Sequence, residues 1–244
     1  MKSRETLILA IESSCDETAA AVVRDGRETL SNVVATQHHL HETYRGVVPE
    51  IASRAHLERI LPVVRQALSE AGVEVGRLDA VTAGTRPGLI GALLVGVSLA
   101  KAVAWSLSIP FLGVDHVESH LLAGLLDGED VEWPAVGLVV SGGHTTLYRM
   151  RGALEVERLG GTIDDAAGEA FDKAATMLGL GYPGGPLLDE LAETHEGAPT
   201  VRLPISLPAK ESLDFSFSGV KTAMLYAIRG TPTRKDGATV FPRG

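Results

Sequence analysis

One pattern occurs twice in this chain of 244 residues: an apolar strand, a short polar turn and a second apolar strand. The first copy covers residues 6–23, and its turn at 12–18 reads Glu-Ser-Ser-Cys-Asp-Glu-Thr. The second covers residues 135–150, and its turn at 141–145 reads Ser-Gly-Gly-His-Thr. Two strands that flank a polar turn predict a β-hairpin. Because the unit recurs, we expect two lobes that each present one polar loop to a shared cleft.

A duplicated lobe with two facing phosphate loops is the arrangement of the actin-like ATPases. The pattern therefore predicts an α/β fold of the actin-like (ribonuclease H-like) class, with an N-terminal lobe at residues 1–115 and a C-terminal lobe at residues 116–244. The composition changes after Gly230, and the final segment has no amphipathic pattern. We expect residues 230–244 to be unstructured.

Three segments predict helices that connect the strands. Apolar residues recur at helical spacing over residues 56–71. A helix is also expected over residues 162–179, with Asp164 and Asp165 in its first turns, where the helix dipole favours carboxylates. The apolar stretch 89–100 contains glycines and is shorter than the roughly 20 residues that span a bilayer. We interpret it as a buried helix and expect no association with a membrane.

Charge and cysteine content narrow the possible partners and the compartment. The net charge of −9 opposes a polyanionic partner unless basic residues cluster or another subunit supplies positive surface. Cys15 is the single cysteine, so an intrachain disulfide and a cysteine-based zinc knuckle are excluded, and a reducing compartment fits best. Residues 8–12 include a carboxylate where a signal peptide would need an apolar run. We therefore expect a cytoplasmic protein that begins with a strand.

His116 and His120 are the candidate metal ligands. If their segment is helical, both imidazoles lie on one face about 6 Å apart along the axis, which suits two bonds to one ion. Asp115 and Glu118 could orient the rings as hydrogen-bond acceptors. The alternative is a helix that carries two histidines by chance, and the chain offers no obvious third ligand. Four other histidines are expected in loops and on helix surfaces: His38, His39, His41 and His56.

The turn Ser141-Gly142-Gly143 resembles a phosphate cradle. An apolar strand precedes it, and the missing side chains would let backbone N–H groups approach an anion. The alternative is a tight turn in which the glycines only supply positive φ. Asp16, in the equivalent turn of the first lobe, could bind a metal-bound water or a hydroxyl, or could be a solvated turn residue.

Gly185 and Asp189 have two interpretations, whereas Asp172 and residues 214–222 have one each by pattern alone. Gly185 and Asp189 could bring backbone N–H groups and a carboxylate to a ribose, or could form an ordinary helix start. By pattern alone, Asp172 fits a solvated helix face, and residues 214–222 fit an edge strand.

Seven motifs occur in a fixed order between about residue 7 and residue 229. They are residues 11–18, 46–54, the pair His116 and His120, and residues 140–145, 164–173, 182–186 and 215–222. In this order they resemble the universal family of tRNA threonylcarbamoyladenosine transferases, formerly called glycoproteases or O-sialoglycoprotein endopeptidases. The resemblance makes the solvated-face interpretation of Asp172 and the edge-strand interpretation of 214–222 improbable.

The resemblance implies an acyltransferase with an actin-like, two-lobed fold. Its reaction would transfer the threonylcarbamoyl group from threonylcarbamoyl-AMP to N6 of the adenosine next to the anticodon, in tRNAs that read codons beginning with A. One divalent ion per chain is implied, with Fe²⁺ favoured and Zn²⁺ as the alternative, bound by His116 and His120. The implied adenylate contacts are Val139, Val140, Ser141, Gly142, Gly143, Asp172, Gly185 and Asp189. No residue is assigned as general base.

The implied partners are tRNA, a paralogous actin-like subunit and a small ATPase of the same pathway. Two departures from the family pattern stand out. Arg86 occupies a position before Pro87 and Gly88 where relatives typically have glycine. Family members also continue beyond position 244, with a glycine-rich Asn motif and an aspartate that completes the metal site, so we expect a truncated chain with an incomplete second lobe.

Two other functions compete with the transferase. A metalloprotease would need a His-Glu-x-x-His motif, and here Glu118 lies two residues after the first histidine. A non-catalytic truncated paralogue or scaffold is favoured by the missing segment, but the retained histidine pair and Ser-Gly-Gly turn argue against it.

Overall fold

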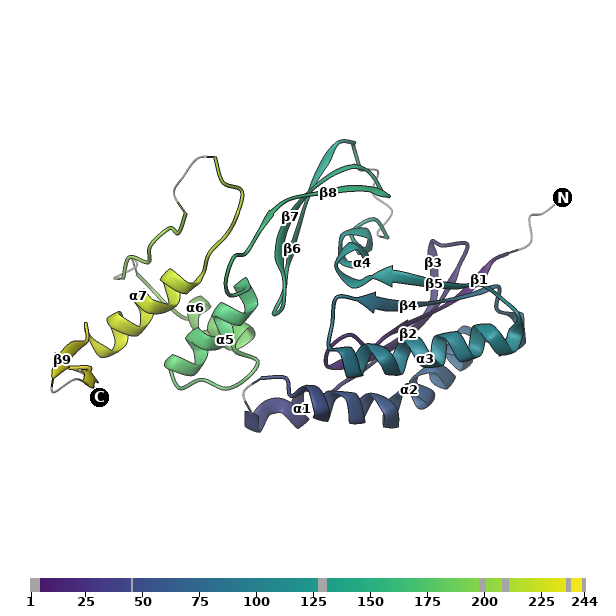
Figure 1. The fold of residues 1–244 in the computed structure, drawn as a ribbon, viewed down its shortest axis with the longest axis horizontal. Coiled ribbons are helices and arrows are strands. Elements are labelled where there is room, and N and C mark those ends of the chain that lie inside the picture. Colours follow the sequence, from purple (N-terminus) through teal and green to yellow (C-terminus); the bar gives the residue numbers. More distant parts are fainter. Residues whose placement is uncertain are drawn as a thin grey trace. The chain divides into compact units, whose positions relative to one another are not determined.

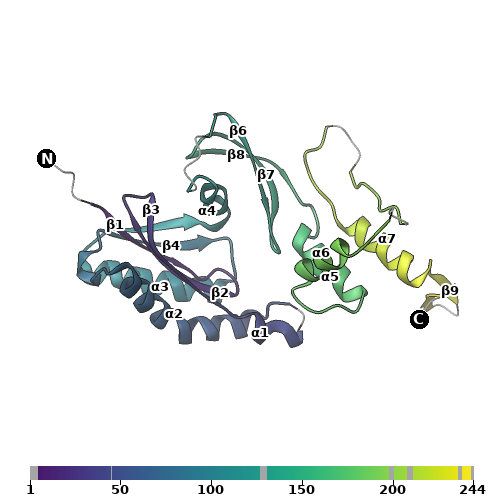
Figure 2. The same ribbon diagram turned by 180° about the vertical axis from the view of Figure 1, so that it is seen from behind.

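The computed structural model describes residues 5–44, 46–126, 131–197, 201–207, 211–235 and 238–242. The chain divides into two compact units, Met1–Gly128 and Glu129–Gly244, which we describe separately. Figures 1 and 2 show the elements of each unit from opposite sides. The sequence predicted the boundary between the lobes at residues 115 and 116, one helix earlier than this division.

The first unit is built on a five-stranded sheet of order β3-β2-β1-β4-β5. Strand β1 pairs antiparallel with β2, and β2 with β3, whereas β4 runs parallel to β1 and β5 parallel to β4. The first predicted hairpin is thus confirmed, with Leu7 opposite Arg24 and Glu12 opposite Ala19. The strands are β1 (Leu7–Glu12), β2 (Glu17–Arg24), β3 (Glu28–Thr36), β4 (Ala80–Arg86) and β5 (Phe111–Asp115).

Helices α2 (Pro49–Ala71) and α3 (Ile90–Leu107) lie together on one face of this sheet (Figures 1 and 2). The predicted helix over 56–71 is confirmed at its C-terminal end, where Gly72 adopts the left-handed conformation with φ 64° and stops the helix. It begins earlier, because a proline at the first position is compatible with a helix start. The short elements are α1 (His38–His41), η1 (Glu42–Tyr44), η2 (Val75–Arg77) and α4 (His116–Ala123).

Helix α3 packs on the core through a line of small residues. Ala92, Gly96, Ala100 and Ala104 recur every four positions and are all buried, so the helix approaches β1 and β4 closely. By length and composition α3 could cross a membrane, although one such helix is also typical of a protein core. The sequence described the stretch as a buried helix, and the structure buries one face of it: Ile90 and Trp105 are exposed.

The second unit contains a three-stranded antiparallel sheet of order β6-β7-β8. Its strands are β6 (Ala135–Val140), β7 (Thr145–Gly152) and β8 (Glu155–Gly161). Val140 lies opposite Thr145 at the predicted turn, which confirms the second hairpin. The described part of this unit thus has three strands in the sheet where the first unit has five, as expected for an incomplete second lobe.

Among the described residues, three helices follow the second sheet: α5 (Ala167–Met177), α6 (Gly184–Glu193) and α7 (Ser218–Arg229). The predicted helix start at residue 162 was wrong. Thr162 instead forms a bridge with Phe215, and Asp164 accepts a hydrogen bond from the backbone N–H of Phe217 at 2.8 Å. These long-range contacts hold the segment in an extended form before α5.

The C-terminal segment also differs from the prediction. Strands β9 (Thr233–Lys235) and β10 (Ala238–Val240) pair antiparallel where no regular structure was expected. Residues 218–222, which composition alone placed in an edge strand, form the start of α7. Helix α4 contacts β4 and β5, which explains why it belongs to the first unit.

Candidate functional site

The end of β5 fixes the start of the helix that carries the histidine pair. The carboxylate of Asp115 accepts hydrogen bonds from the backbone N–H groups of Val117 at 2.9 Å and Glu118 at 3.2 Å, which is an N-cap. Arg86, the residue that departs from the family pattern, pairs with the same carboxylate at 3.1 Å. Asp115 therefore anchors α4, whereas the sequence suggested it as an orienting acceptor for the imidazoles.

The two predicted metal ligands converge on one point. The Nε2 atoms of His116 and His120 are 3.1 Å apart, and the rings are nearly perpendicular with centroids 4.5 Å apart. Two nitrogens bound to one tetrahedral ion at 2.0–2.1 Å would be separated by about 3.3 Å. The described geometry therefore fits a shared ion, with neither ring required to move far.

Glu12, at the end of β1, faces the other nitrogen of His116. Its Oε2 atom lies 3.4 Å from Nδ1 of His116, and the hydroxyl of Ser14 lies 3.4 Å from the same nitrogen. The hydrogen bond that His116 donates to the carboxylate of Glu12 raises the pKa of His116. Burial opposes ionisation of Glu12, yet its hydrogen bonds with His116 and Ser14 hold the pKa of the carboxyl below its usual value. The pKa of His120 is lowered, chiefly by burial and then by His116.

A groove of about 440 Å³ opens beside these side chains. Glu12, His116 and His120 line it on one side, and small residues of β1, β2 and β4 form its floor. Thr82 Oγ1, from that floor, is buried without a hydrogen-bond partner among the described residues. The histidine pair is thus reachable by a small molecule and is not sealed inside the core.

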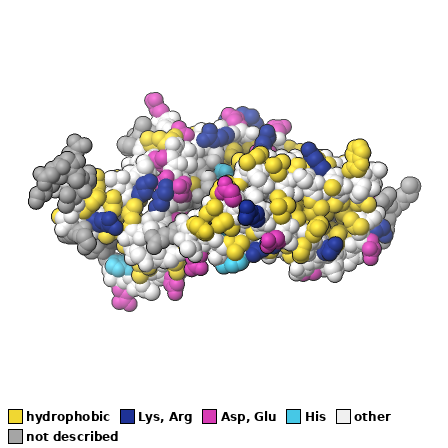
Figure 3. Space-filling view, turned by 60° about the horizontal axis from the view of Figure 1, so that its bottom comes forward, with side chains coloured by type: hydrophobic (Ala, Val, Ile, Leu, Met, Phe, Trp, Pro, Cys, Tyr) yellow, Lys and Arg dark blue, Asp and Glu magenta, His cyan; other side chains and the backbone are white. Residues whose placement is uncertain are grey.

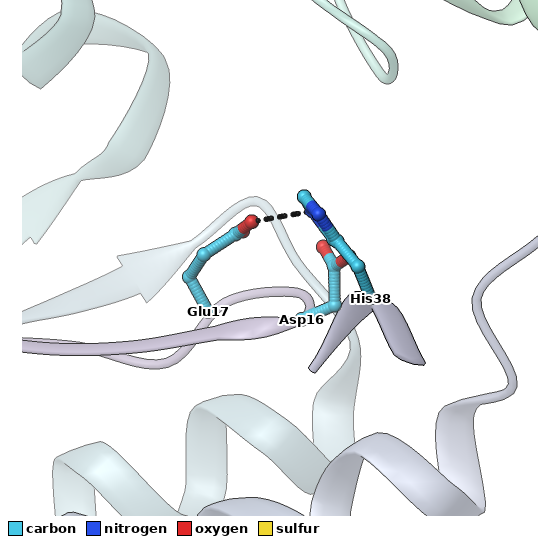
Figure 4. Close-up of side chains that lie close together, drawn as sticks. All are labelled: Asp16, Glu17 and His38. Carbon is cyan, nitrogen blue, oxygen red and sulfur yellow. Dashed lines mark ion pairs between the residues drawn. The ribbon is translucent and has the colours of Figure 1, made fainter. Parts of the chain in front are cut away.

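A second group of possible ligands lies where the first polar turn meets the start of α1, and it consists of Asp16, Glu17 and His38 (Figure 4). His38 Nε2 is 3.0 Å from Glu17 Oε1 and 3.7 Å from Asp16 Oδ2, and the ligand atoms of all three lie within 4.8 Å of one another. Burial, followed by the charge of Asp16, raises the pKa of Glu17. Asp16 is 8% exposed, so its interpretation as a solvated turn residue was wrong.

Hydrogen bonds with two helices, α3 and α2, fix the first polar turn in place. The hydroxyl of Ser13 donates to the carbonyl of Ala92 at 2.8 Å and accepts from the N–H of Gly96 at 3.2 Å, which ties the turn to α3. A Cβ at Gly96 would lie 2.4 Å from this hydroxyl, so only glycine leaves room for it. From α2, Nε2 of the fully buried His56 lies 3.0 Å from the carbonyl of Cys15.

Two histidines expected at the surface are therefore buried. His56 also contacts the hydroxyl of Thr18 through Nδ1 at 2.8 Å. His41 is fully buried, and its Nδ1 accepts the N–H of Val48 at 3.3 Å. Burial lowers the pKa of both imidazoles. Cys15 is exposed, yet desolvation by the surrounding protein, followed by the charge of Asp16, raises the pKa of its thiol to about 12 and makes it a poor nucleophile.

In the second unit, the Ser-Gly-Gly turn lies on the N-terminus of α5. The N–H of Gly168 donates to the carbonyl of Ser141 at 3.1 Å, and a Cβ at Gly168 would lie 2.8 Å from the Cα of Gly142. Gly142 and Gly143 do not adopt positive φ, and a Cβ at either position would meet open space. The interpretation that these glycines only supply positive φ was therefore wrong. Of the strand residues before the turn, Val139 is buried and Val140 is exposed.

The other predicted adenylate contacts lie on α5 and α6. Asp172 accepts a hydrogen bond from the N–H of Gly184 at 2.7 Å and so satisfies one free donor at the start of α6, which the solvated-face interpretation did not anticipate. A Cβ at Gly185 would meet open space, and the exposed Asp189 follows one turn later on the same helix face. Gly168 and Asp172 are four residues apart on α5 and therefore lie on the same face of that helix. The Ser-Gly-Gly turn contacts this face at Gly168, and the start of α6 contacts it at Asp172.

Comparison with known proteins agrees with this architecture. The family model of the tRNA N6-adenosine threonylcarbamoyltransferases matches residues 28–243. The enzyme of that name from Trichlorobacter lovleyi is 58% identical over 233 residues, which are 95% of this chain and 67% of that protein. The enzyme from Geotalea uraniireducens is 56% identical over 232 residues, with the same two coverages. The chain thus spans about two thirds of the length of these relatives.

Similarity to one solved structure supports the fold alone. The (R)-2-hydroxyglutaryl-CoA dehydratase component A of Acidaminococcus fermentans superposes with a TM-score of 0.50 at 13% identity. The match covers 94% of this chain and 70% of the dehydratase chain. YeaZ from Pseudomonas aeruginosa gives a TM-score of 0.41 at 22% identity, covering 63% of this chain and 64% of its own.

The fold is α/β of the actin-like class, and the relatives make this protein an acyltransferase that acts on tRNA. The chain belongs to the tRNA N6-adenosine threonylcarbamoyltransferase family. The protease and scaffold alternatives are not favoured by these relatives.

Proposed function

We propose that the chain transfers the threonylcarbamoyl group from threonylcarbamoyl-AMP to N6 of the adenosine next to the anticodon, at a metal centre formed by His116 and His120. The observation that carries this proposal is the convergence of the two Nε2 atoms at 3.1 Å beside an open groove. Fe²⁺ is the favoured ion and Zn²⁺ the alternative, since imidazole nitrogens bind both.

The bound ion would polarise the carbonyl of the threonylcarbamoyl group and stabilise negative charge on its oxygen. In the reaction, N6 of adenosine forms a bond to the carbonyl carbon, the bond from that carbon to the phosphate oxygen breaks, and N6 loses one proton while AMP leaves. His116 and His120 would supply two ligand nitrogens, and Glu12 and Ser14 would hold the His116 ring through Nδ1.

The adenylate would bind in the second unit along α5. Gly142 and Gly143 present backbone without side chains and have open space in front of them, which suits the approach of a phosphate. Gly185 has the same property at the start of α6, where the helix dipole favours an anion. The exposed carboxylate of Asp189 would accept hydrogen bonds from ribose hydroxyls. Val139, Val140, Ser141 and Asp172 would shape and hold these two turns.

The partners are tRNA, a paralogous actin-like subunit and a small ATPase of the same pathway. The net charge of −9 supports a partner that contributes part of the positive surface for tRNA. Figure 3 displays hydrophobic side chains on the α2 and α3 side of the first unit, which supports a protein partner there. The exposed apolar residues of this surface are Leu57, Leu61, Ile90, Leu94 and Trp105. Action on tRNA and a single, unpaired cysteine favour the cytoplasm and argue against a role at a membrane.

The test of the metal centre is the metal content of purified protein. We expect about one divalent ion per chain in the wild type, and none in the double variant His116→Ala/His120→Ala, because both ligand nitrogens are lost. His195→Ala is the matched control, since His195 is an exposed histidine of the second unit. Equal metal in the wild type and the double variant would refute the proposed site.

A further inference from the structure

The carboxylate of Glu12 is fixed in place by its own backbone surroundings. Glu12 is the last residue of β1, and its Oε1 atom accepts the N–H of Ser14 at 2.5 Å. The other oxygen, Oε2, is the atom that lies 3.4 Å from Nδ1 of His116. One carboxylate therefore connects the first polar turn to the ring of the first candidate ligand.

Gly84 provides the space for this carboxylate. Ile11 on β1 and Ala83 on β4 are paired in the parallel strands. Glu12 is the next residue on β1, and Gly84 is the next residue on β4. A Cβ at position 84 would lie 2.4 Å from Oε2 of Glu12 and 3.2 Å from its Cδ atom. Any other residue at this position would therefore push the carboxylate away from its observed place.

The consequence for His116 follows from the chemistry of imidazole. A carboxylate at Nδ1 accepts the Nδ1–H hydrogen, which places the lone pair of the neutral ring on Nε2 and fixes the orientation of the ring. Nε2 of His116 is the atom that faces Nε2 of His120. The carboxylate and the second histidine thus act on opposite nitrogens of one ring.

We propose that Glu12 is a positioning residue that sets the tautomer and orientation of His116 for metal binding, and that Gly84 is required because it leaves room for this carboxylate. The inference rests on the proposed metal site at His116 and His120. It assigns a role to the first carboxylate of the Glu-Ser-Ser-Cys-Asp-Glu-Thr turn that is distinct from the roles of Asp16 and Glu17.

The test measures Co²⁺ binding, by the visible absorption of the bound ion and by competition with a chelator. We expect Glu12→Ala to weaken Co²⁺ affinity about 10- to 100-fold, the range typical of an orienting partner of a metal-bound histidine. Glu12→Gln keeps an oxygen acceptor and should lose less. Gly84→Ala should weaken affinity to a similar extent as Glu12→Ala. The matched controls are Glu58→Ala, on the exposed side of α2, and Gly76→Ala, where a Cβ meets open space, and both should bind like the wild type.

A double variant separates positioning from general damage. If Gly84 acts only through Glu12, then Glu12→Ala/Gly84→Ala should bind Co²⁺ no more weakly than Glu12→Ala alone. Additive losses, or wild-type affinity in Glu12→Ala, would overturn the inference while leaving the metal site intact. Absence of Co²⁺ binding in the wild type would instead overturn the proposed metal site itself. If Glu12→Ala does not fold, Glu12→Gln and Gly84→Ala decide the question: wild-type affinity in both overturns the inference, and a loss in both supports it.

Discussion

At the scale of residues, the first polar turn depends on a neutral buried imidazole. Cys15 offers a carbonyl, which only accepts, so Nε2 of His56 must carry the hydrogen and Nδ1 then accepts from the hydroxyl of Thr18. Burial lowers the pKa of His56 in the folded protein below its ordinary value near 6.5. Above pH 6.5 the folded and unfolded states are both neutral at this site, and the contribution of His56 to stability is complete.

As the pH falls through 6.5, the unfolded chain takes up a proton that folded His56 does not, so the free energy of unfolding decreases. The loss is at most about 1.4 kcal/mol per pH unit for one histidine. We expect His56→Gln, which retains an N–H donor, to remove this part of the pH dependence between pH 7.5 and 5.5. Urea unfolding followed by circular dichroism measures it, and identical pH dependence in the two proteins would contradict the assignment of a neutral His56.

At the scale of elements, the Ser-Gly-Gly turn and α5 form one unit of structure, because Gly168 packs under Gly142. A side chain at position 143 points into open space, so Gly143→Val should leave stability nearly unchanged but should occupy the space that a phosphate needs. We expect AMP binding to weaken by on the order of 2 kcal/mol, about 30-fold in Kd. Calorimetry with AMP measures this, with Gly152→Val as control at another open glycine. Unchanged affinity in Gly143→Val would mean that the turn does not bind the phosphate.

Elements also explain which predictions succeeded. Both hairpins were predictable, because apolar strands that flank a short polar turn determine them locally. The helix that carries His116 was a condition of the metal-site prediction, and the structure forms it. The start of α5 was not, because the contacts of Asp164 and Asp165 come from residues about 50 positions away in sequence, Phe217 and Lys221. The role of Glu12 was missed for the same reason, since 104 positions separate it from His116.

At the scale of the whole molecule, the two units differ in how their first strands pair with neighbouring strands. In the first unit, β1 pairs on both sides, with β2 and β4, whereas β6 lies at one end of the second sheet. Val136, Leu138 and Val140 lie on one face of β6 and are all more than half exposed. Such a face favours association with other apolar surfaces. The likeness in order between β1-β2-β3 and β6-β7-β8 is the duplication that the sequence predicted, and it relates the first polar turn to the Ser-Gly-Gly turn.

The measurement that tests the central claim most directly is the nucleoside content of tRNA after reaction. An unmodified tRNA that reads a codon beginning with A would be incubated with threonylcarbamoyl-AMP, the protein and its paralogous subunit, and then digested for mass spectrometry. In protein extended by the C-terminal segment of a relative, we expect N6-threonylcarbamoyladenosine with the unmutated sequence and with His195→Ala, and its loss with His116→Ala/His120→Ala. Equal amounts of the modified nucleoside with the double variant, in protein shown to be folded, would contradict the account.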